Sequence, residues 1–157
     1  LIREKLSNWE QRVEELALLG FGYADLIIAV PDFWIDVRTL DDLDAAAAKF
    51  RARNNFRLRI ATKYHRLIRE YLRQNGVADY QLVDSQGATE GTVKNETAEA
   101  VADITSTGET LRANHLRLLD DGPALRSQAT LFKALNVNLS DAERKDLADL
   151  LTTLGLT

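Results

Sequence analysis

Apolar and polar positions along this chain follow two periods, one of strands and one of helices. Apolar or alternating runs of strand length occupy Leu26–Val30, Arg57–Thr62, Tyr80–Val83 and Ala98–Ile104. Between them, residues 41–53 and 64–75 carry apolar side chains at the three- and four-residue spacing of amphipathic helices. Strands that alternate with helices in this way predict an α/β fold with a mainly parallel sheet.

The last third of the chain adds shorter elements. We expect a short polar helix over Thr92–Thr97 and strands over His115–Leu119 and Leu125–Leu131. Ser140 stands three residues before Glu143, which is the spacing of a capping box, and leucines at helical spacing follow it. A helix is therefore predicted to run from residue 140 to 154.

Composition narrows the classes of function. The chain has 157 residues, 45% of them hydrophobic and 28% charged, with a net charge of −4. No basic stripe interleaved with aromatics is present, which argues against a nucleic-acid surface. Without cysteine, and with two histidines far apart, neither a disulfide nor a zinc site is expected. We expect no membrane span, and a cytoplasmic location, because no run of eighteen apolar residues and no signal peptide is evident.

A loop of small, hydroxylated residues follows the strand that ends at Asp103. Its sequence, T-S-T-G, runs from Thr105 to Gly108 and leads into a polar turn. Successive backbone N–H groups and hydroxyls suit a phosphate monoester, and glycine lets the backbone approach closely. The loop lacks the Gly-Lys-Ser/Thr of a Walker A motif and the glycines of a dinucleotide fingerprint. On the local pattern alone, an ordinary turn with a helix cap is the alternative.

Asp103 followed by T-S-T-G-x-T-L-x-x-N-x-L closely resembles the phosphoribosyl-diphosphate (PRPP) loop of ATP phosphoribosyltransferase, the first enzyme of histidine biosynthesis. Three further segments resemble the same family. Leu19–Pro31 is similar to its crossing strand, Arg59–Tyr64 to its R-[IV]-A-T-[KS]-Y element, and Ser85–Gly91 to its G-[SA]-[VT]-E loop. The order of these elements agrees with the family, so the resemblance covers most of the chain.

The resemblance implies transfer of phosphoribosyl from PRPP to N1 of ATP, with release of pyrophosphate. It implies a cradle for the 5′-phosphate of PRPP formed by Thr105, Ser106, Thr107, Gly108, Glu109 and Thr110. It further implies that Glu90 and Asp103 hold the ribose hydroxyls. Read from the residues alone, these two acids are a solvated loop acid and a turn cap. No residue is assigned as nucleophile or acid–base catalyst, and Mg²⁺ is expected to arrive with PRPP, with no direct protein ligand.

Lys63 follows a predicted strand, at the sheet edge where ligands of α/β proteins collect. Two interpretations remain open: Lys63 contacts a phosphate oxygen, or it is a surface lysine at the start of a helix.

The resemblance also implies two lobes like those of periplasmic solute-binding proteins, with the first lobe incomplete. Residues 1–30 would form part of the first lobe and the crossing strand. Residues 31–120 would form the second lobe with the PRPP loop, and residues 121–157 would return to the first lobe and end in a helix. Because roughly the first third of a family member would precede Leu1, we expect a truncated chain that is inactive alone.

The partners that the resemblance implies are PRPP and ATP as substrates, a second copy in a homodimer, and a regulatory subunit similar to histidyl-tRNA synthetase. The last follows from an expected short form that lacks a histidine-sensing domain. Two rivals remain: a non-catalytic anion- or solute-binding module of the same fold, and a phosphoribosyltransferase for another base. The second usually carries two adjacent acids before its loop, whereas Ala102 precedes Asp103 here.

Overall fold

The computed structural model describes residues 1–85 and 87–156, and these divide into two compact units. The central unit is Tyr23–Ser127, and the terminal unit combines Leu1–Gly22 with Gln128–Thr157. Every candidate site residue lies in the central unit. Gln86, in the segment that resembles the family's G-[SA]-[VT]-E loop, lies outside the described residues.

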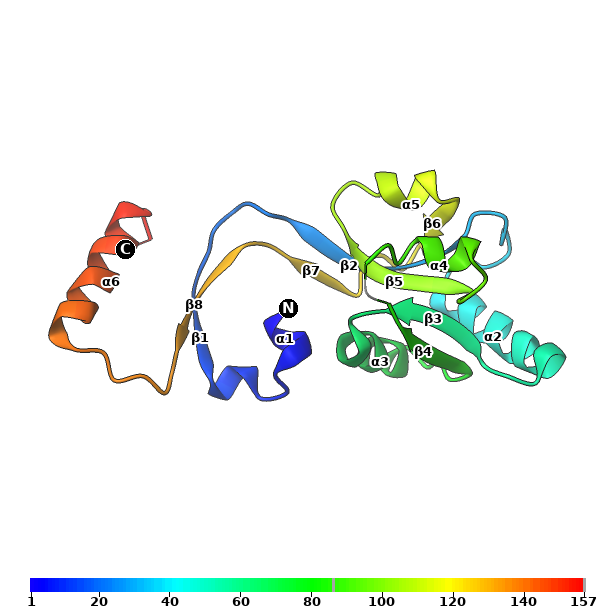
Figure 1. Ribbon diagram of the computed structural model, residues 1–157, viewed down its shortest axis with the longest axis horizontal. Coiled ribbons are helices and arrows are strands. Elements are labelled where there is room, and N and C mark those ends of the chain that lie inside the picture. Colours follow the sequence, from blue (N-terminus) through cyan, green and yellow to red (C-terminus); the bar gives the residue numbers. More distant parts are fainter. Residues whose placement is uncertain (86, 157) are drawn as a thin grey trace. The chain divides into compact units, whose positions relative to one another are not determined.

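Six strands form the sheet of the central unit (Figure 1). They are β2 (Ala24–Pro31), β3 (Leu58–Thr62), β4 (Tyr80–Asp84), β5 (Ala100–Thr105), β6 (Leu116–Leu118) and β7 (Leu125–Ser127). Their order is β4-β3-β5-β2-β6. β7 pairs with the first residues of β2, on the same side of that strand on which β6 pairs with its last residues. The strand that carries the candidate loop, β5, is therefore central.

The prediction of a mainly parallel sheet is wrong, because the sheet is mixed. β3 pairs in parallel with β4 and β5, whereas β2 runs antiparallel to β5, β6 and β7. Residues 26–30 are continuously apolar because both faces of β2 are covered: Ile28 faces one hydrophobic cluster and Ile27 the other. Burial on two faces produces such a run whatever the direction of the strand.

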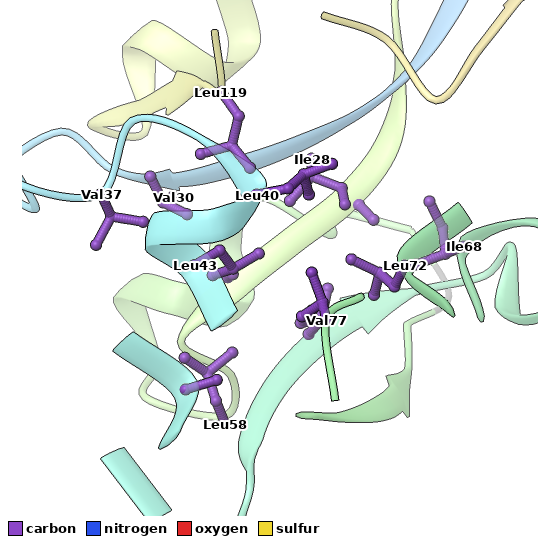
Figure 2. Packing of buried hydrophobic residues seen from close by; sticks show 14 of the residues in the cluster. Ile28, Val30, Val37, Leu40, Leu43, Leu58, Ile68, Leu72, Val77 and Leu119 are labelled. Carbon is purple, nitrogen blue, oxygen red and sulfur yellow. The ribbon is translucent and has the colours of Figure 1, made fainter. Parts of the chain in front are cut away.

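Helices cover both faces of this sheet (Figure 1). The larger cluster packs under α2 (Leu40–Asn54) and α3 (His65–Gln74), and Figure 2 shows side chains such as Leu43, Leu58 and Leu72 filling it. The opposite face carries a smaller cluster that includes Leu111 of α5 (Glu109–Ala113), with α4 (Gly91–Lys94) against β5. The short helix expected over 92–97 thus begins one residue earlier and ends at Lys94.

The helix α2 begins at a capping box. The Thr39 hydroxyl accepts a hydrogen bond from the Asp42 N–H at 3.2 Å, and the Asp42 carboxylate accepts one from the Thr39 N–H at 2.9 Å. Hydrogen bonds from the Arg38 N–H and from the Thr39 hydroxyl and N–H lower the pKa of Asp42. The cap explains why the predicted helix begins here, in a segment otherwise rich in acids.

Thr39→Ala is expected to lower the free energy of unfolding by about 1 kcal/mol, the usual cost of losing an N-cap side chain. The cap precedes Leu40 in the larger cluster, on the face opposite α4 and α5. Ligand affinity at the candidate site should therefore stay within twofold of wild type. Urea denaturation gives the first quantity and calorimetric titration the second; a large change in affinity would contradict the separation of the two faces.

The terminal unit contains a two-stranded antiparallel ribbon of β1 (Val13–Leu18) and β8 (Thr130–Ala134). Its other elements are α1 (Ile2–Lys5), the 3₁₀ helix η1 (Trp9–Gln11) and α6 (Asp141–Thr153). The capping box of Ser140 and Glu143 is confirmed, with both of its hydrogen bonds formed. The single strand predicted over 125–131 is wrong: it is two strands, since β7 pairs with β2 and β8 with β1.

The lobe ranges expected from the sequence remain a prediction about the whole protein. Within the described chain, β2 and β7 lie on either side of residues 31–120, and both pair inside the central sheet. No helix of residues 1–85 and 87–156 has both the length and the apolar character needed to cross a membrane.

Candidate functional site

The candidate residues gather where strand ends meet at one edge of the central sheet. β3 and β5 run in parallel, so Lys63 and Thr105 leave the sheet at the same edge. The antiparallel β2 begins there, with Asp25 paired to Thr105 and Ile27 paired to Asp103. Because side chains alternate along a strand, Asp103 shares the face of Val101, which α4 and α5 cover. The edge therefore carries both acidic and basic groups on one face.

Asp103 is a nearly buried acid with one oxygen engaged. Its exposed fraction is 8%, and its Oδ1 accepts a hydrogen bond from the Ile104 N–H at 2.8 Å. The Nζ of Lys63 lies 3.5 Å from the same oxygen, and the Lys63 side chain is 43% exposed. Among the residues that the structure describes, no partner contacts Oδ2. That oxygen can accept hydrogen bonds from a ligand without displacing a protein contact.

The loop after β5 is organised by its own hydroxyls. The Gly108 N–H donates to Oγ1 of Thr105 at 2.9 Å, and the Glu109 N–H donates to Oγ1 of Thr107 at 3.3 Å. Each hydroxyl thus accepts from the backbone and keeps its own proton to donate. The N–H groups of Ser106 and Thr110 have no hydrogen-bond partner within residues 1–85 and 87–156. The loop therefore presents both hydroxyl and amide donors.

Gly108 closes the loop in a left-handed conformation, with φ of 72° and ψ of 6°. A Cβ at this position would lie 3.2 Å from the nearer guanidinium nitrogen of Arg112. The backbone angle therefore favours glycine, and a side chain here would also make the Arg112 guanidinium shift by a few tenths of an ångström.

Arg112 is a site residue that the sequence did not single out. Its guanidinium donates to the Thr107 carbonyl at 3.2 Å and thereby spans the loop. It places a positive charge beside a loop of amide and hydroxyl donors, which favours an anion there. In the sequence, Arg112 is marked only as a basic residue one helical turn after Gly108, and basic residues at such a spacing are common in helices.

A pocket of about 420 Å³ lies along the loop, within the central unit. Its walls combine the loop residues 105–108 with side chains from the edge of the sheet and from α5. The apolar part comprises Ile27, Leu111, Leu116, Leu118 and Pro123, and the charged part comprises Asp25, Arg112 and Arg117. The loop therefore borders a hollow large enough for a nucleotide-sized ligand.

Glu90 is less completely placed by the structure. It is half-buried at the N-terminal end of α4, and α4 contacts β5 on the face that holds Asp103. No hydrogen bond or ion pair joins Glu90 to Asp103 among the described residues. The structure thus brings Lys63, Asp103 and the loop together, whereas Glu90 lies at the N-terminal end of α4, the helix that contacts β5.

The mixed sheet, the helices on both faces and the site at the strand ends define an α/β protein of the periplasmic-binding-protein type. A solved mutant of ArgBP from T. maritima has this fold, with a TM-score of 0.57 at 15% identity over 95% of this chain and 57% of that chain. An ATP phosphoribosyl transferase (HisG:HisZ) complex from Thermotoga maritima gives a TM-score of 0.65 at 18% identity, over 91% of this chain and 60% of that chain.

The chain belongs to the ATP phosphoribosyltransferase family. The family model with that description matches residues 1–155. An ATP phosphoribosyltransferase of Cereibacter sphaeroides is 72% identical over 142 residues, which are 90% of this chain and 60% of the relative. The relative from Chelativorans sp. is 55% identical over 85% of this chain and 59% of its own length. The chain thus spans about three fifths of the length of these relatives.

Proposed function

We propose that the whole protein transfers the phosphoribosyl group of PRPP to N1 of ATP, the first step of histidine biosynthesis. In this reaction the lone pair of N1 forms a bond to the anomeric carbon, and the bond from that carbon to the diphosphate oxygen breaks. No protein nucleophile is needed, so the protein acts by orientation and by charge stabilisation. The donor-rich loop after Asp103, in a chain of this family, is the observation that carries the proposal.

The loop is the proposed site of the 5′-phosphate. Its donors are the N–H groups of Ser106 and Thr110, which have no partner among the described residues, and the hydroxyl protons of Thr105 and Thr107. Glu109 is the first residue of α5, and its N–H donates to the Thr107 hydroxyl, which holds the end of the loop in place. Amides converging on one point bind a phosphate monoester without a strongly basic surface, which fits the net charge of −4.

Asp103 and Glu90 are the proposed ribose ligands. The Oδ2 of Asp103, which has no partner within residues 1–85 and 87–156, supports this role, since a carboxylate oxygen accepts from ribose hydroxyls. Lys63, which is 3.5 Å from Oδ1, balances the charge of the acid and is half-exposed, so its ammonium group is free to turn toward a phosphate oxygen. We therefore assign Lys63 to the substrate site as well.

Magnesium is proposed to enter with PRPP. Among the described residues, no group of three or more His, Cys, Asp or Glu side chains is arranged to hold a metal ion. Mg²⁺ commonly binds through substrate phosphates, so the diphosphate of PRPP would itself supply ligands for the ion. The ion would neutralise charge on the departing diphosphate, while the protein holds the sugar.

The proposed partners are a second copy of the catalytic chain and a regulatory subunit similar to histidyl-tRNA synthetase. The second proposal is supported by the HisG:HisZ complex from Thermotoga maritima, whose fold this chain shares. Co-purification of the full-length protein with that subunit, followed by light scattering, tests both partners.

The proposed activity is tested with the full-length protein and its regulatory subunit. Pyrophosphate release should require PRPP, ATP and Mg²⁺ together, and omission of any one should abolish it. Omitting ATP while measuring PRPP binding separates chemistry from capture. Tight PRPP binding without pyrophosphate release under any condition would instead favour the anion- or solute-binding module.

A further inference from the structure

The helix α5, which follows the proposed phosphate loop (residues 105–110), is closed by the side chain of Asn114. The Nδ2 of Asn114 donates to the Thr110 carbonyl at 2.8 Å. The Asn114 N–H donates to the same carbonyl at 3.2 Å and to the Leu111 carbonyl at 3.0 Å. Thr110 belongs both to the phosphate loop and to the first turn of α5. The asparagine therefore holds a loop residue from the other end of the helix.

The helix α5 has only five residues and depends on contacts outside its own backbone. Because the first turn of a helix is costly to form, isolated helices shorter than about 12 residues are marginal in water. Leu111 and Leu116, which are 3% and 2% exposed, anchor one side of α5 and the strand after it in the smaller hydrophobic cluster. The Asn114 side chain closes the polar end between these two anchors.

The same helix fixes groups that border the phosphate loop. The Arg112 N–H donates to the Gly108 carbonyl at 3.1 Å, and the Arg112 guanidinium donates to the Thr107 carbonyl at 3.2 Å. The Thr110 N–H, a proposed phosphate donor, has no partner among the described residues. Unwinding of α5 would release this N–H and the Arg112 bridge together. A loop whose donors are already in place binds more tightly, because binding need not order it.

Two other asparagines make the same bond in longer helices. The Nδ2 of Asn54 donates to the Phe50 carbonyl in α2 at 2.8 Å. The Nδ2 of Asn75, where α3 ends, donates to the Tyr71 carbonyl, also at 2.8 Å. These helices have 15 and 10 residues, so the bond is one of many in each. In α5 it acts on little more than one turn, and its loss should matter more there.

We propose that Asn114 is a positioning residue for PRPP, which acts by keeping α5 and the phosphate loop in their binding arrangement before the substrate arrives. This inference rests on the proposed function, because it takes the loop as the site of the 5′-phosphate. It adds a residue that contacts no substrate and whose carboxamide determines how well the donors of the loop are aimed.

The test combines calorimetric titration of the full-length protein with steady-state kinetics in the presence of its regulatory subunit. Asn114→Leu nearly keeps the shape of the side chain and removes its donor. It should raise the Kd and the KM for PRPP about five- to tenfold, the effect of losing one neutral hydrogen bond. The kcat and the KM for ATP should change less than twofold.

A rescue variant and a second ligand show whether the effect passes through the loop. Asn114→Ser should change the Kd for PRPP less than twofold, because a serine hydroxyl can donate to the carbonyl four residues earlier. Ribose 5-phosphate, which carries the 5′-phosphate and no diphosphate, should lose affinity for Asn114→Leu by the same factor as PRPP. Unchanged affinity for ribose 5-phosphate would contradict an action on the phosphate loop.

Asn75→Leu is the matched control for stability. It removes the same bond at the same distance from α3, which covers the opposite face of the sheet. It should lower the midpoint of urea denaturation at least as much as Asn114→Leu does, while the Kd for PRPP stays within twofold of wild type. Equal losses of PRPP affinity in the two variants would overturn the inference, since they would reflect a general loss of stability.

Failure of the inference can be told apart from failure of the proposed function. A full-length wild-type protein that binds no PRPP would refute both. A wild type that binds PRPP, with a Kd for Asn114→Leu less than threefold higher, would overturn the inference alone. Should Asn114→Leu fail to fold, Asn114→Ala, which also removes the donor, decides by the same threshold.

Discussion

Asp103→Asn is expected to weaken PRPP binding by about 10- to 100-fold, because a hydrogen bond to a charged acceptor contributes about 1.5–3 kcal/mol. Asparagine has nearly the same shape, and its Oδ1 can still accept the Ile104 N–H. The other oxygen, Oδ2, which faces the proposed ribose, is then replaced by the neutral NH₂ group of asparagine, and this group cannot accept a hydrogen bond. Calorimetric titration of the full-length variant with PRPP gives the dissociation constant directly.

The fold should tolerate this substitution. Lys63 loses its ionic partner, but its side chain is 43% exposed and water can solvate the ammonium group. We expect a loss of at most about 1 kcal/mol in the free energy of unfolding, as for other exposed ion pairs. Asp79→Asn is a matched control, since Asp79 pairs with Arg51 and lies just before β4 begins. An affinity of Asp103→Asn equal to that of this control would remove the ribose assignment.

Gly108→Val is expected to have the larger effect, with PRPP affinity reduced about 100-fold or more. A left-handed backbone costs about 1–2 kcal/mol for a residue with a side chain, and a β-branched one is worse. The new Cβ would also stand 3.2 Å from the Arg112 guanidinium that spans the loop. Relief of either conflict breaks the hydrogen bonds from the Gly108 and Glu109 N–H groups that hold the Thr105 and Thr107 hydroxyls. Each charge-assisted hydrogen bond to the phosphate that the disordered loop then loses weakens binding by about 1.5–3 kcal/mol.

Gly76→Val is the matched control for backbone strain. Gly76 has φ of 76° after α3, and no atom would lie within 4 Å of a Cβ there. Both variants should therefore lose a similar amount of stability in urea denaturation, whereas only Gly108→Val should lose PRPP affinity. If the two variants bind PRPP equally well, the loop does not form the phosphate site.

Much of the local structure was predicted from residue patterns. The helices over 41–53 and 64–75 are confirmed within two residues at each end, because helical spacing of apolar side chains and nearby caps act over only a few residues. The α6 cap formed as its S-x-x-E pattern indicates. The strand at 13–18 was missed, because its charged and apolar residues follow neither period cleanly and its pairing partner lies far away in the chain.

The site was predicted in part. Resemblance to a family indicated Asp103 and the T-S-T-G loop, and the position after a predicted strand indicated Lys63. The structure brings these together at one sheet edge. Arg112 was not singled out, because a basic residue in a short helix is unremarkable until its guanidinium is seen to contact the Thr107 carbonyl. The roles of these residues in binding PRPP stay predictions that the substitutions above address.

Residue patterns alone indicated the loop, the glycine at its close, the cap of α6, and the family to which the chain belongs. These features depend on backbone preferences and on contacts between near neighbours. Packing of the whole central unit decided the rest: the antiparallel direction of β2, the meeting of Lys63 with Asp103, and the buried hydrogen bond from the Ser85 hydroxyl to Oγ1 of Thr89. Those contacts join distant segments, and their geometry follows from which strands become neighbours, which no local period encodes.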